Sequence, residues 1–324
     1  MKPKTFAALL LSVSLMISLG PSMALGAEYP RRPITLICPW GAGGGTDAVS
    51  RILATLLKQE LGVPVNVVNR TGGSGAVGHT VMATARPNGY TLGLATLELT
   101  MMHWMGLTKV TYRDVTPVAM VNIDPAAVNV RTDASWKTYG ELAEYVKGNP
   151  GKLLCSGTGQ GGSWHLAMAG WLRAEGMSPK AVKWIPSKGA APALQDLMAG
   201  GIDMSTCSLP EAATLIEAGK VRPLAIMAEE RDPKFPDVPT LREVGADWTC
   251  GAWRGVVAPK GTSPDIVAVL EKTLAKIVKS ADFIKFMQNR GYGISWLDSE
   301  AFAKKIAESD RDNGQIMKAA GIVR

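Results

Sequence analysis

Histidine is scarce in this sequence of 324 residues, and its three copies are far apart. His79, His103 and His165 have no spacing, with one another or with a cysteine, that is typical of a metal site. Protein zinc sites use closely spaced Cys and His ligands. We therefore expect no metal, and no motif in the sequence indicates a cofactor.

Long uncharged apolar runs are missing beyond the N-terminus. There, Lys2 and Lys4 precede the apolar stretch Phe6–Leu19, and small residues lead to Ala24–Ala27. A basic start, an apolar middle and a small-residue cleavage site are the layout of a secretory signal peptide. The apolar stretch is short for a membrane span. We expect residues 1–27 to be a cleaved signal peptide and the mature chain to be periplasmic.

Cysteine is also rare, with four copies and no C-x-x-C pair. An oxidising compartment permits disulfides, and four cysteines allow three full pairings. Each cysteine lies in an apolar, strand-like context, which favours buried free thiols, with one disulfide as the alternative. The cysteines are Cys38, Cys155, Cys207 and Cys250.

A basic stripe with interleaved aromatic residues is absent. The chain has 35 basic and 28 acidic residues, a formal net charge of +7, and its lysines are scattered. This pattern excludes nucleic acid as an expected partner. A modest positive field attracts an anionic solute instead.

One glycine loop stands out among the features that are present. An apolar strand, Ile34–Trp40, runs into Gly41–Asp47, and an amphipathic helix begins at Thr46. The first amides of a helix lack partners in the chain and carry the positive end of its dipole. The loop therefore predicts a site for a small anion, with Thr46 and Asp47 as helix cap and ligand-positioning pair. The plain alternative is a tight turn with a capping threonine.

The loop matches neither of two known nucleotide-binding motifs. A phosphate-binding Walker loop ends in Gly-Lys-Ser/Thr, whereas Gly45-Thr46-Asp47 has no lysine. The dinucleotide fingerprint requires an acid after the next strand. That strand ends in Val68-Asn69-Arg70, without one.

Apolar strands alternate with amphipathic helices along the chain, which predicts an α/β fold with largely parallel sheets. We expect strands at Ile34–Trp40, Pro64–Asn69, Thr91–Leu97, Lys152–Ser156, Val182–Pro186, Ile202–Cys207 and Arg222–Met227. We expect helices at Thr46–Leu61, from Gly72 through Ala85, at Tyr139–Lys147, from Ser163, at Ala190–Ala199, at Glu211–Ala218, from Pro264, at Ala281–Asn289 and at Ser299–Ala320. Two further extended segments, Ala126–Val130 and Gly251–Ala258, are candidates for crossings between two lobes.

A series of short motifs then resembles one known family. They are Tyr29-Pro30-x-x-Pro33-Ile34, Pro39-Trp40, Gly43-Gly44-Gly45-Thr46-Asp47, Gly75, Pro87-Asn88-Gly89-Tyr90-Thr91-Leu92, Gly159-x-x-x-Ser163-x-His165-Leu166, Pro192-Ala193-Leu194-x-Asp196-Leu197, Gly200-Gly201-Ile202-Asp203, Ala218–Ala225 and Pro236-Asp237-Val238-Pro239-Thr240. In this order and spacing the mature chain resembles the Bug-type periplasmic solute receptors of tripartite tricarboxylate transporters. Trp40 and Trp164 depart from the usual family pattern beside the two glycine loops.

The resemblance implies a two-lobed flytrap, each lobe a sheet flanked by helices, that binds a small carboxylate without catalysis. Residues 28–130 and 251–324 would form the first lobe, and residues 131–250 the second. Two extended crossover segments would join them. Integral-membrane transporter subunits are the implied partners, and we expect a monomer. The segment Trp253–Gly261 favours a di- or tricarboxylate as ligand.

The resemblance also implies the ligand-binding residues, in two glycine loops and several strand and helix ends. They are Trp40, Gly41, Ala42, Gly43, Gly44, Gly45, Thr46, Asp47, Thr96, Ser156, Thr158, Gly159, Gln160, Gly161, Gly162, Ser163, His165, Lys188, Gly189, Ala190, Asp203, Ser208 and Arg254. The alternative role of Arg254 is a salt bridge at the lobe junction. The alternative role of Lys188 is a solvated charge in a loop.

Two other functions remain as alternatives. An exported serine hydrolase would use Ser163, but a nucleophile elbow needs Gly-x-Ser-x-Gly and Gly161–His165 lacks the last glycine. Ser163 and His165 are also two positions apart at a helix start and do not face each other. A carboxylate sensor would share every residue with the receptor, so the sequence does not separate these two.

Overall fold

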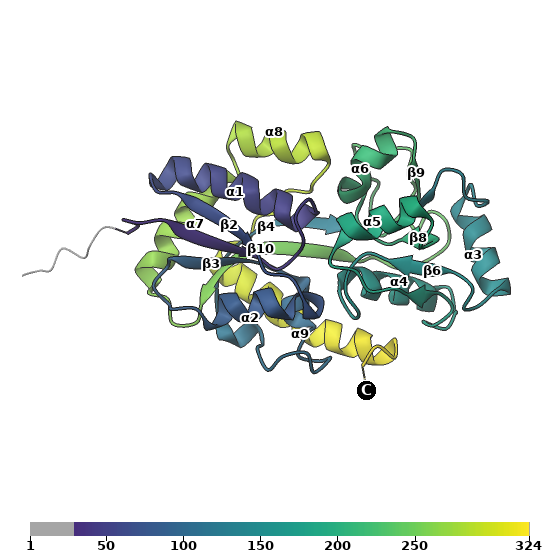
Figure 1. Cartoon of the computed structure of the whole chain (residues 1–324), viewed down its shortest axis with the longest axis horizontal. Helices are drawn as coiled ribbons and strands as arrows, with labels where there is room; N and C mark the ends of the chain where they lie inside the picture. Colours follow the sequence, from purple (N-terminus) through teal and green to yellow (C-terminus); the bar gives the residue numbers. More distant parts are fainter. Residues whose placement is uncertain (1–28, 324) are drawn as a thin grey trace, which may run out of the picture.

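The computed structural model describes residues 29–323. They form two lobes along the long axis of the molecule, each built on a five-stranded sheet (Figure 1). This confirms the predicted α/β two-lobed fold. The sheets are mixed and not largely parallel as predicted, because each has two parallel and two antiparallel strand pairs. The expected signal peptide, residues 1–27, lies outside the described residues. Within residues 29–323, no helix has the length and apolar character needed to span a membrane.

The first lobe has the strand order β2-β1-β3-β10-β4. Strand β1 is parallel to β2 and β3, while β10 is antiparallel to β3 and β4. Its strands are β1 (Ile34–Cys38), β2 (Val65–Asn69), β3 (Thr91–Thr96), β4 (Val115–Pro125) and β10 (Gly251–Pro259). Its helices are α1 (Gly45–Leu61), α2 (Ala76–Thr84), α7 (Pro264–Ile277), α8 (Ala281–Arg290) and α9 (Ser299–Ala319).

Helices cover both faces of this sheet, as the strand pattern requires. Figure 1 shows α1 and α8 on one side and α2 and α9 on the other. Helix α7 shares an apolar core with α1 and α8. Helix α1 buries Val49, Leu53 and Leu57 completely, an apolar stripe at helical spacing. It ends at Gly62, whose left-handed backbone (φ 71°) suits a residue without a Cβ. The 3-10 turns η1 (Gly73–Gly75), η2 (Leu97–Thr100) and η3 (Tyr112–Asp114) lie in the connections.

The second lobe has the strand order β7-β6-β8-β5-β9. Its strands are β5 (Ala127–Arg131), β6 (Leu154–Ser156), β7 (Lys183–Trp184), β8 (Met204–Ser205) and β9 (Val221–Ile226). Its helices are α3 (Tyr139–Gly148), α4 (Ser163–Ala174), α5 (Ala190–Ala199) and α6 (Leu209–Glu217). Strand β6 is parallel to β7 and β8, whereas β5 is antiparallel to β8 and β9.

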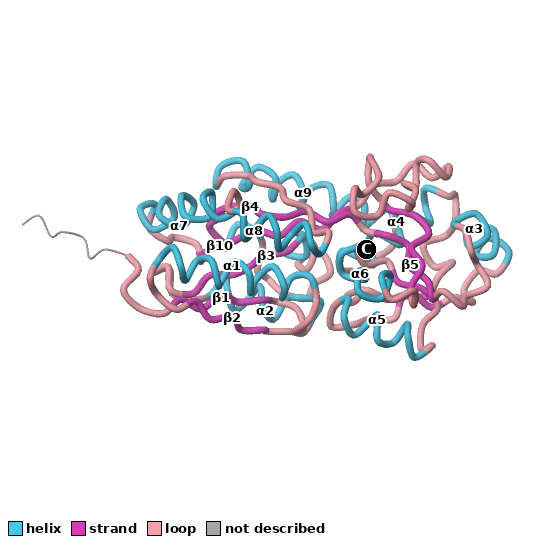
Figure 2. Tube along the Cα trace, turned by 90° about the horizontal axis from the view of Figure 1, so that it is seen from above, coloured by secondary structure: helices cyan, strands magenta, loops and turns pink. Residues whose placement is uncertain are grey.

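The chain crosses between the lobes at two neighbouring places. It leaves the first sheet after Pro125 and enters the second at Ala127, earlier than the boundary expected at Val130. It returns at Cys250. Three backbone hydrogen bonds join the crossings: the Ala126 N–H donates to Cys250, the Met227 N–H to Ala126, and the Cys250 N–H to Met227. Figure 2 shows the crossing strands as the link between the lobes.

Several elements differ from their expected ranges. The predicted strands Val182–Pro186 and Ile202–Cys207 shorten to the two-residue strands β7 and β8. The helix expected from Gly72 begins as the turn η1, because Gly72, Gly73 and Gly75 have positive φ. Strand β4 was not predicted at all. All four cysteines have free thiols, and Cys38, Cys155 and Cys207 are buried.

Candidate functional site

A small cavity lies where the two lobes meet. Its volume is about 20 Å³, room for about one water molecule. Its wall combines the first glycine loop, the ends of β3 and β10, and the starts of helices in the second lobe. The lining residues are Trp40, Gly41, Gly44, Gly45, Thr46, Thr96, Glu98, Thr158, Ser163, Trp164, Gly189, Ala190, Ala191, Pro192, Glu211, Ala252 and Arg254.

Three helices begin at this cavity. Helix α1 contributes Gly45, α4 contributes Ser163, and α5 contributes Ala190, each the first residue of its helix. First-turn N–H groups have no acceptor within their own helix, and the dipoles add positive potential there. Thr46 and Ala191 are the second residues of α1 and α5, so their N–H groups also lack an acceptor within the helix. The helix starts of both lobes therefore place N–H donors and positive potential at the cavity, which favours an anionic group.

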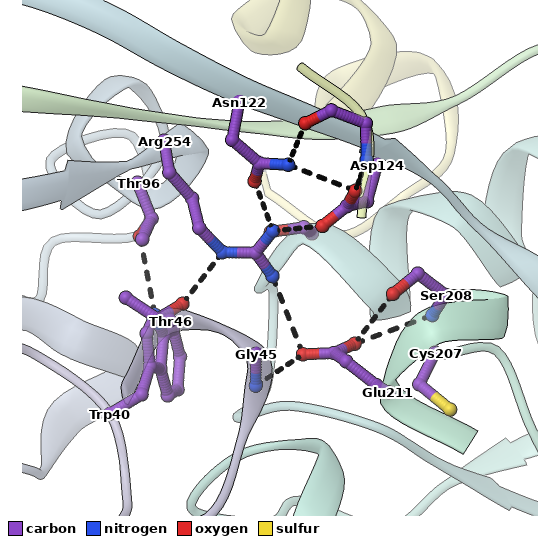
Figure 3. A network of polar contacts seen from close by, with 12 residues as sticks. Trp40, Gly45, Thr46, Thr96, Asn122, Asp124, Cys207, Ser208, Glu211 and Arg254 are labelled. Carbon is purple, nitrogen blue, oxygen red and sulfur yellow. Dashed lines mark hydrogen bonds and ion pairs between the residues drawn. The ribbon is translucent and has the colours of Figure 1, made fainter. Parts of the chain in front are cut away.

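Arg254 is the cation of the site, and it is 2% exposed. Its guanidinium donates to Thr46 Oγ1 at 3.0 Å and to Asn122 Oδ1 at 2.5 Å, and it forms an ion pair with Asp124 (Figure 3). Burial alone would lower the pKa of Arg254, but Asp124 and Glu211 raise it. Arg254 is thus a fixed positive charge held in the first lobe.

Glu211 brings a carboxylate from the second lobe to the same place. Its Oε1 lies 3.4 Å from Arg254 Nη2 and accepts from the Gly45 N–H at 3.3 Å, while its Oε2 accepts from the Ser208 N–H and hydroxyl. Burial raises the pKa of Glu211 and outweighs the attraction of Arg254. Glu211 therefore caps α6 in its own lobe and meets α1 in the other.

Glu98 crosses the cleft in the opposite direction. Its Oε1 accepts from the Ser163 N–H at 2.8 Å and from the Ser163 hydroxyl, and its Oε2 accepts from Thr96 Oγ1 at 2.5 Å. Thr96 Oγ1 in turn accepts from the Trp40 indole N–H at 3.2 Å. Each lobe therefore places one carboxylate at a helix start of the other lobe.

Two further hydrogen bonds between the lobes, each involving one of the glycine loops, complete the closed arrangement. The Gly41 N–H donates to Lys188 O at 3.2 Å, and Ser74 Oγ donates to Gln160 O at 2.7 Å. A Cβ on Gly159 would lie 2.3 Å from Ser74 Oγ, so the approach of the two lobes requires glycine there.

Asp47 is directed into its own loop. Its carboxylate accepts from the Gly43 N–H, from Asn69 Nδ2 and, through two bonds, from Arg51. Burial would raise the pKa of Asp47, but these donors lower it. Asp47 therefore stabilises the loop conformation that presents the α1 start.

Ser163 and His165 do not form a nucleophile–base pair. The Ser163 hydroxyl donates to Glu98, whereas His165 Nδ1 accepts from the Gly161 N–H at 2.9 Å. The His165 ring stacks on Trp184, and burial lowers its pKa to about 4. His165 thus braces the second glycine loop in its neutral form.

The structure brings about half of the expected binding residues to the cavity wall. These are Trp40, Gly41, Gly44, Gly45, Thr46, Thr96, Thr158, Ser163, Gly189, Ala190 and Arg254. The others lie outside that wall, in the loops or strand ends behind it: Ala42, Gly43, Asp47, Ser156, Gly159, Gln160, Gly161, Gly162, His165, Lys188, Asp203 and Ser208. Asp203, for example, accepts from the Leu154 N–H at 2.8 Å and links β6 to β8.

Six lining residues were not among the expected set: Glu98, Trp164, Ala191, Pro192, Glu211 and Ala252. Trp164 had a signal, because it follows Ser163 in the second glycine loop. Glu211 had one too, since Ser208-x-x-Glu211 is a capping box. Nothing in the sequence connects either glutamate with the opposite lobe. Across residues 29–323, no three His, Cys, Asp or Glu side chains are grouped to hold a metal ion.

Two sheet-and-helix lobes joined by paired crossings, with a cavity between them that is lined by helix starts of both lobes, define a solute-binding protein of the flytrap class. The chain belongs to the tripartite tricarboxylate transporter family receptor (TctC) family, whose model matches residues 49–322. Members of this family are receptors, so the chain is a binding protein and not an enzyme.

Individual relatives agree with this assignment. Protein BugT of Bordetella pertussis is 31% identical over 310 residues, covering 91% of this chain and 90% of BugT. The structure of the periplasmic binding protein BugD is 31% identical, with a TM-score of 0.84 over 91% of this chain and 99% of BugD. MatC from Rhodopseudomonas palustris with bound malate is 29% identical, with a TM-score of 0.81 over 89% of this chain and 99% of MatC.

Proposed function

We propose that this chain captures a small organic carboxylate between its lobes in the periplasm and delivers it to integral-membrane transporter subunits. The observation that carries the proposal is the meeting of three helix starts, from both lobes, at one cavity beside Arg254. Charge-assisted bonds from N–H groups to a carboxylate are strong. Only the closed arrangement uses donors of both lobes at once, so the ligand selects closure.

Malate in MatC supports a carboxylate as ligand, since MatC has the same fold over nearly its full length. The resemblance of Trp253–Gly261 to the tricarboxylate-type branch favours a di- or tricarboxylate. Export through a signal peptide at residues 1–27 is part of the proposal. Cell fractionation with and without those residues tests it, because the truncated chain should remain in the cytoplasm.

Thermal unfolding of the purified mature chain tests ligand capture. The panel contains mono-, di- and tricarboxylates and aromatic acids. A ligand at about 100 times its dissociation constant stabilises the folded state by about 2.7 kcal/mol. A clear hit that isothermal titration reproduces supports the proposal, and its absence across the panel contradicts it.

Delivery needs a separate test in cells. Uptake of the identified ligand should require both this chain and the membrane subunits. Uptake that survives deletion of the subunits, together with a ligand-dependent transcriptional response, would indicate a sensor instead.

A further inference from the structure

Glu98 is a carboxylate inside the cavity wall, and it is 1% exposed. It follows β3 directly, in the turn η2. Its hydrogen-bond partners in the described part of the chain are all neutral groups: Thr96 Oγ1, the Ser163 N–H and the Ser163 hydroxyl. These donors, and the dipole of α4, hold the carboxylate without a countercharge from a side chain.

The nearby ionisable groups do not supply that countercharge. His79 is fully buried beside Thr96, and its Nε2 accepts from the Thr96 N–H at 3.2 Å while its Nδ1 contacts Gly75 O. Burial lowers the pKa of His79, so its ring is neutral. Arg254 is already engaged by Asp124 and Glu211.

The cavity wall as described therefore carries more negative than positive groups. Glu98 and Glu211 are its carboxylates, and Arg254 is its cation. Glu98 has hydrogen-bond donors but no cationic side chain as partner, and a ligand that supplies a cation lowers the cost of burying its charge. A second like charge next to Glu98 would add repulsion. The cavity wall thus discriminates between cationic and anionic ligand groups as well as between ligand shapes.

We propose that Glu98 determines the ligand specificity of this receptor, by binding a protonated nitrogen on the captured carboxylate. The ligand is then a small amino-carboxylate. The closed cavity has room for about one water molecule, so the ligand enters when the lobes open. Its ammonium group then lies against Glu98 and Thr96, and its carboxylate lies on the N–H groups of Thr46 and Ala191, the second residues of α1 and α5. This inference rests on the proposed function, since it concerns the same cavity.

Matched pairs of compounds test the proposal. Each pair has one carbon skeleton with and without the amine: γ-aminobutyrate and butyrate, aspartate and succinate, glutamate and glutarate, and 4-(aminomethyl)benzoate and 4-methylbenzoate. Dissociation constants are measured by isothermal titration for the unmodified chain, for Glu98→Gln and for Glu175→Gln. Glu175 is the control carboxylate, because it pairs with Lys147 and Tyr139 in the second lobe, away from the cavity.

We expect at least one amine to bind about tenfold or more tightly than its desamino partner, in line with a charge-assisted hydrogen bond. Glu98→Gln keeps an acceptor for Ser163 but loses the charge, so the ratio should fall to about one or invert. Glu175→Gln should leave it unchanged. A ratio that is the same in Glu98→Gln overturns the proposal.

The dissociation constants of the unmodified chain also test the role of Glu98, even if Glu98→Gln does not fold. Desamino compounds that bind as well as the amines, or better, overturn the role of Glu98 and leave the carboxylate receptor standing. Failure of every carboxylate in both sets overturns the proposed function together with this inference.

Discussion

Arg254 on β10 and Glu211 on α6 lie 3.4 Å apart although they belong to different lobes, and their side chains are 3% and 6% exposed. Asp124, on β4, forms the other ion pair of Arg254. One guanidinium therefore neutralises a carboxylate of each lobe. The stability of the first lobe and the closure of the cleft both depend on it.

Replacing Arg254 by methionine should be strongly destabilising. Asp124 and Glu211 would remain buried without their cation, and breaking a buried pair in this way costs about 3–5 kcal/mol. Urea unfolding at pH 7 measures the loss. Lys276→Met is the control, since Lys276 is 70% exposed in its pair with Glu60 and surface pairs contribute less than about 1 kcal/mol. A loss of that small size for Arg254→Met would contradict the prediction.

A side chain at Gly45 should hinder closure. A Cβ there would lie 2.8 Å from both Arg254 Nη2 and Glu211 Oε1. Because Glu211 belongs to the other lobe, Gly45→Ala should push the lobes apart at this point. We expect weaker ligand binding and a larger radius of gyration with ligand present, measured by small-angle X-ray scattering. Gly140→Ala on α3 meets open space and serves as the control. Equal scattering curves for the two variants would count against the close approach.

Acid should destabilise the chain through His165. Burial lowers the pKa of His165 to about 4 in the folded state, whereas an unfolded histidine titrates near 6.5. Below about pH 6.5 the unfolded state therefore binds the additional proton, and stability falls as the pH drops towards 4. The loss amounts to about 3 kcal/mol.

His165→Gln isolates this contribution, because glutamine retains an acceptor for the Gly161 N–H. Urea unfolding at pH 7 and pH 4.5 should show a smaller acid-induced loss in the variant than in the unmodified chain. Equal losses in the two proteins would show that His165 is protonated in the folded state as readily as in the unfolded one.

The cysteine thiols should be unreactive until the chain unfolds. Burial raises the pKa of Cys155 and of Cys250 to about 12, and it also raises the pKa of Cys38 and Cys207. At pH 8 such a thiol reacts more than about a thousandfold more slowly than a free cysteine, because the thiolate is the nucleophile. Labelling with Ellman's reagent should be negligible in the folded state, and all four cysteines should react in guanidinium. Rapid labelling of Cys38, Cys155 or Cys207 in the folded chain would disprove their burial.

Local signals in the sequence were sufficient for much of the fold. Helix α5 has the predicted bounds Ala190–Ala199, because Pro192 suits a first turn and Gly200 takes the left-handed conformation at the end (φ 77°). Strand β4 was missed since Pro117, Asn122 and Asp124 interrupt its apolar pattern. Asn122 and Asp124 are buried there because they hold Arg254, a partner more than a hundred positions away in the chain.

In the cavity, too, the features that local sequence determines were predicted, and those that depend on long-range contacts were missed. The glycine loops predicted the helix starts, since a glycine-rich turn before an amphipathic helix is a local feature. No local feature indicated that Glu98 and Glu211 reach the cavity, because the capping box of Glu211 predicts only the start of α6 and an acid near an anion site looks unfavourable until its partner is known. Glu211 lies 166 positions from Gly45 and contacts it only after both lobes have formed and closed.

The joined crossings at Ala126, Met227 and Cys250 have a kinetic consequence. Because they tie the crossings together, we expect the lobes to rotate about this point and not to come apart. A captured molecule then leaves only when Glu98 releases Ser163 and Glu211 releases Gly45. The residence time of the ligand is accordingly set by the rate at which the Glu98–Ser163 and Glu211–Gly45 contacts break. A partner that separates these contacts can release the ligand without competing for the cavity.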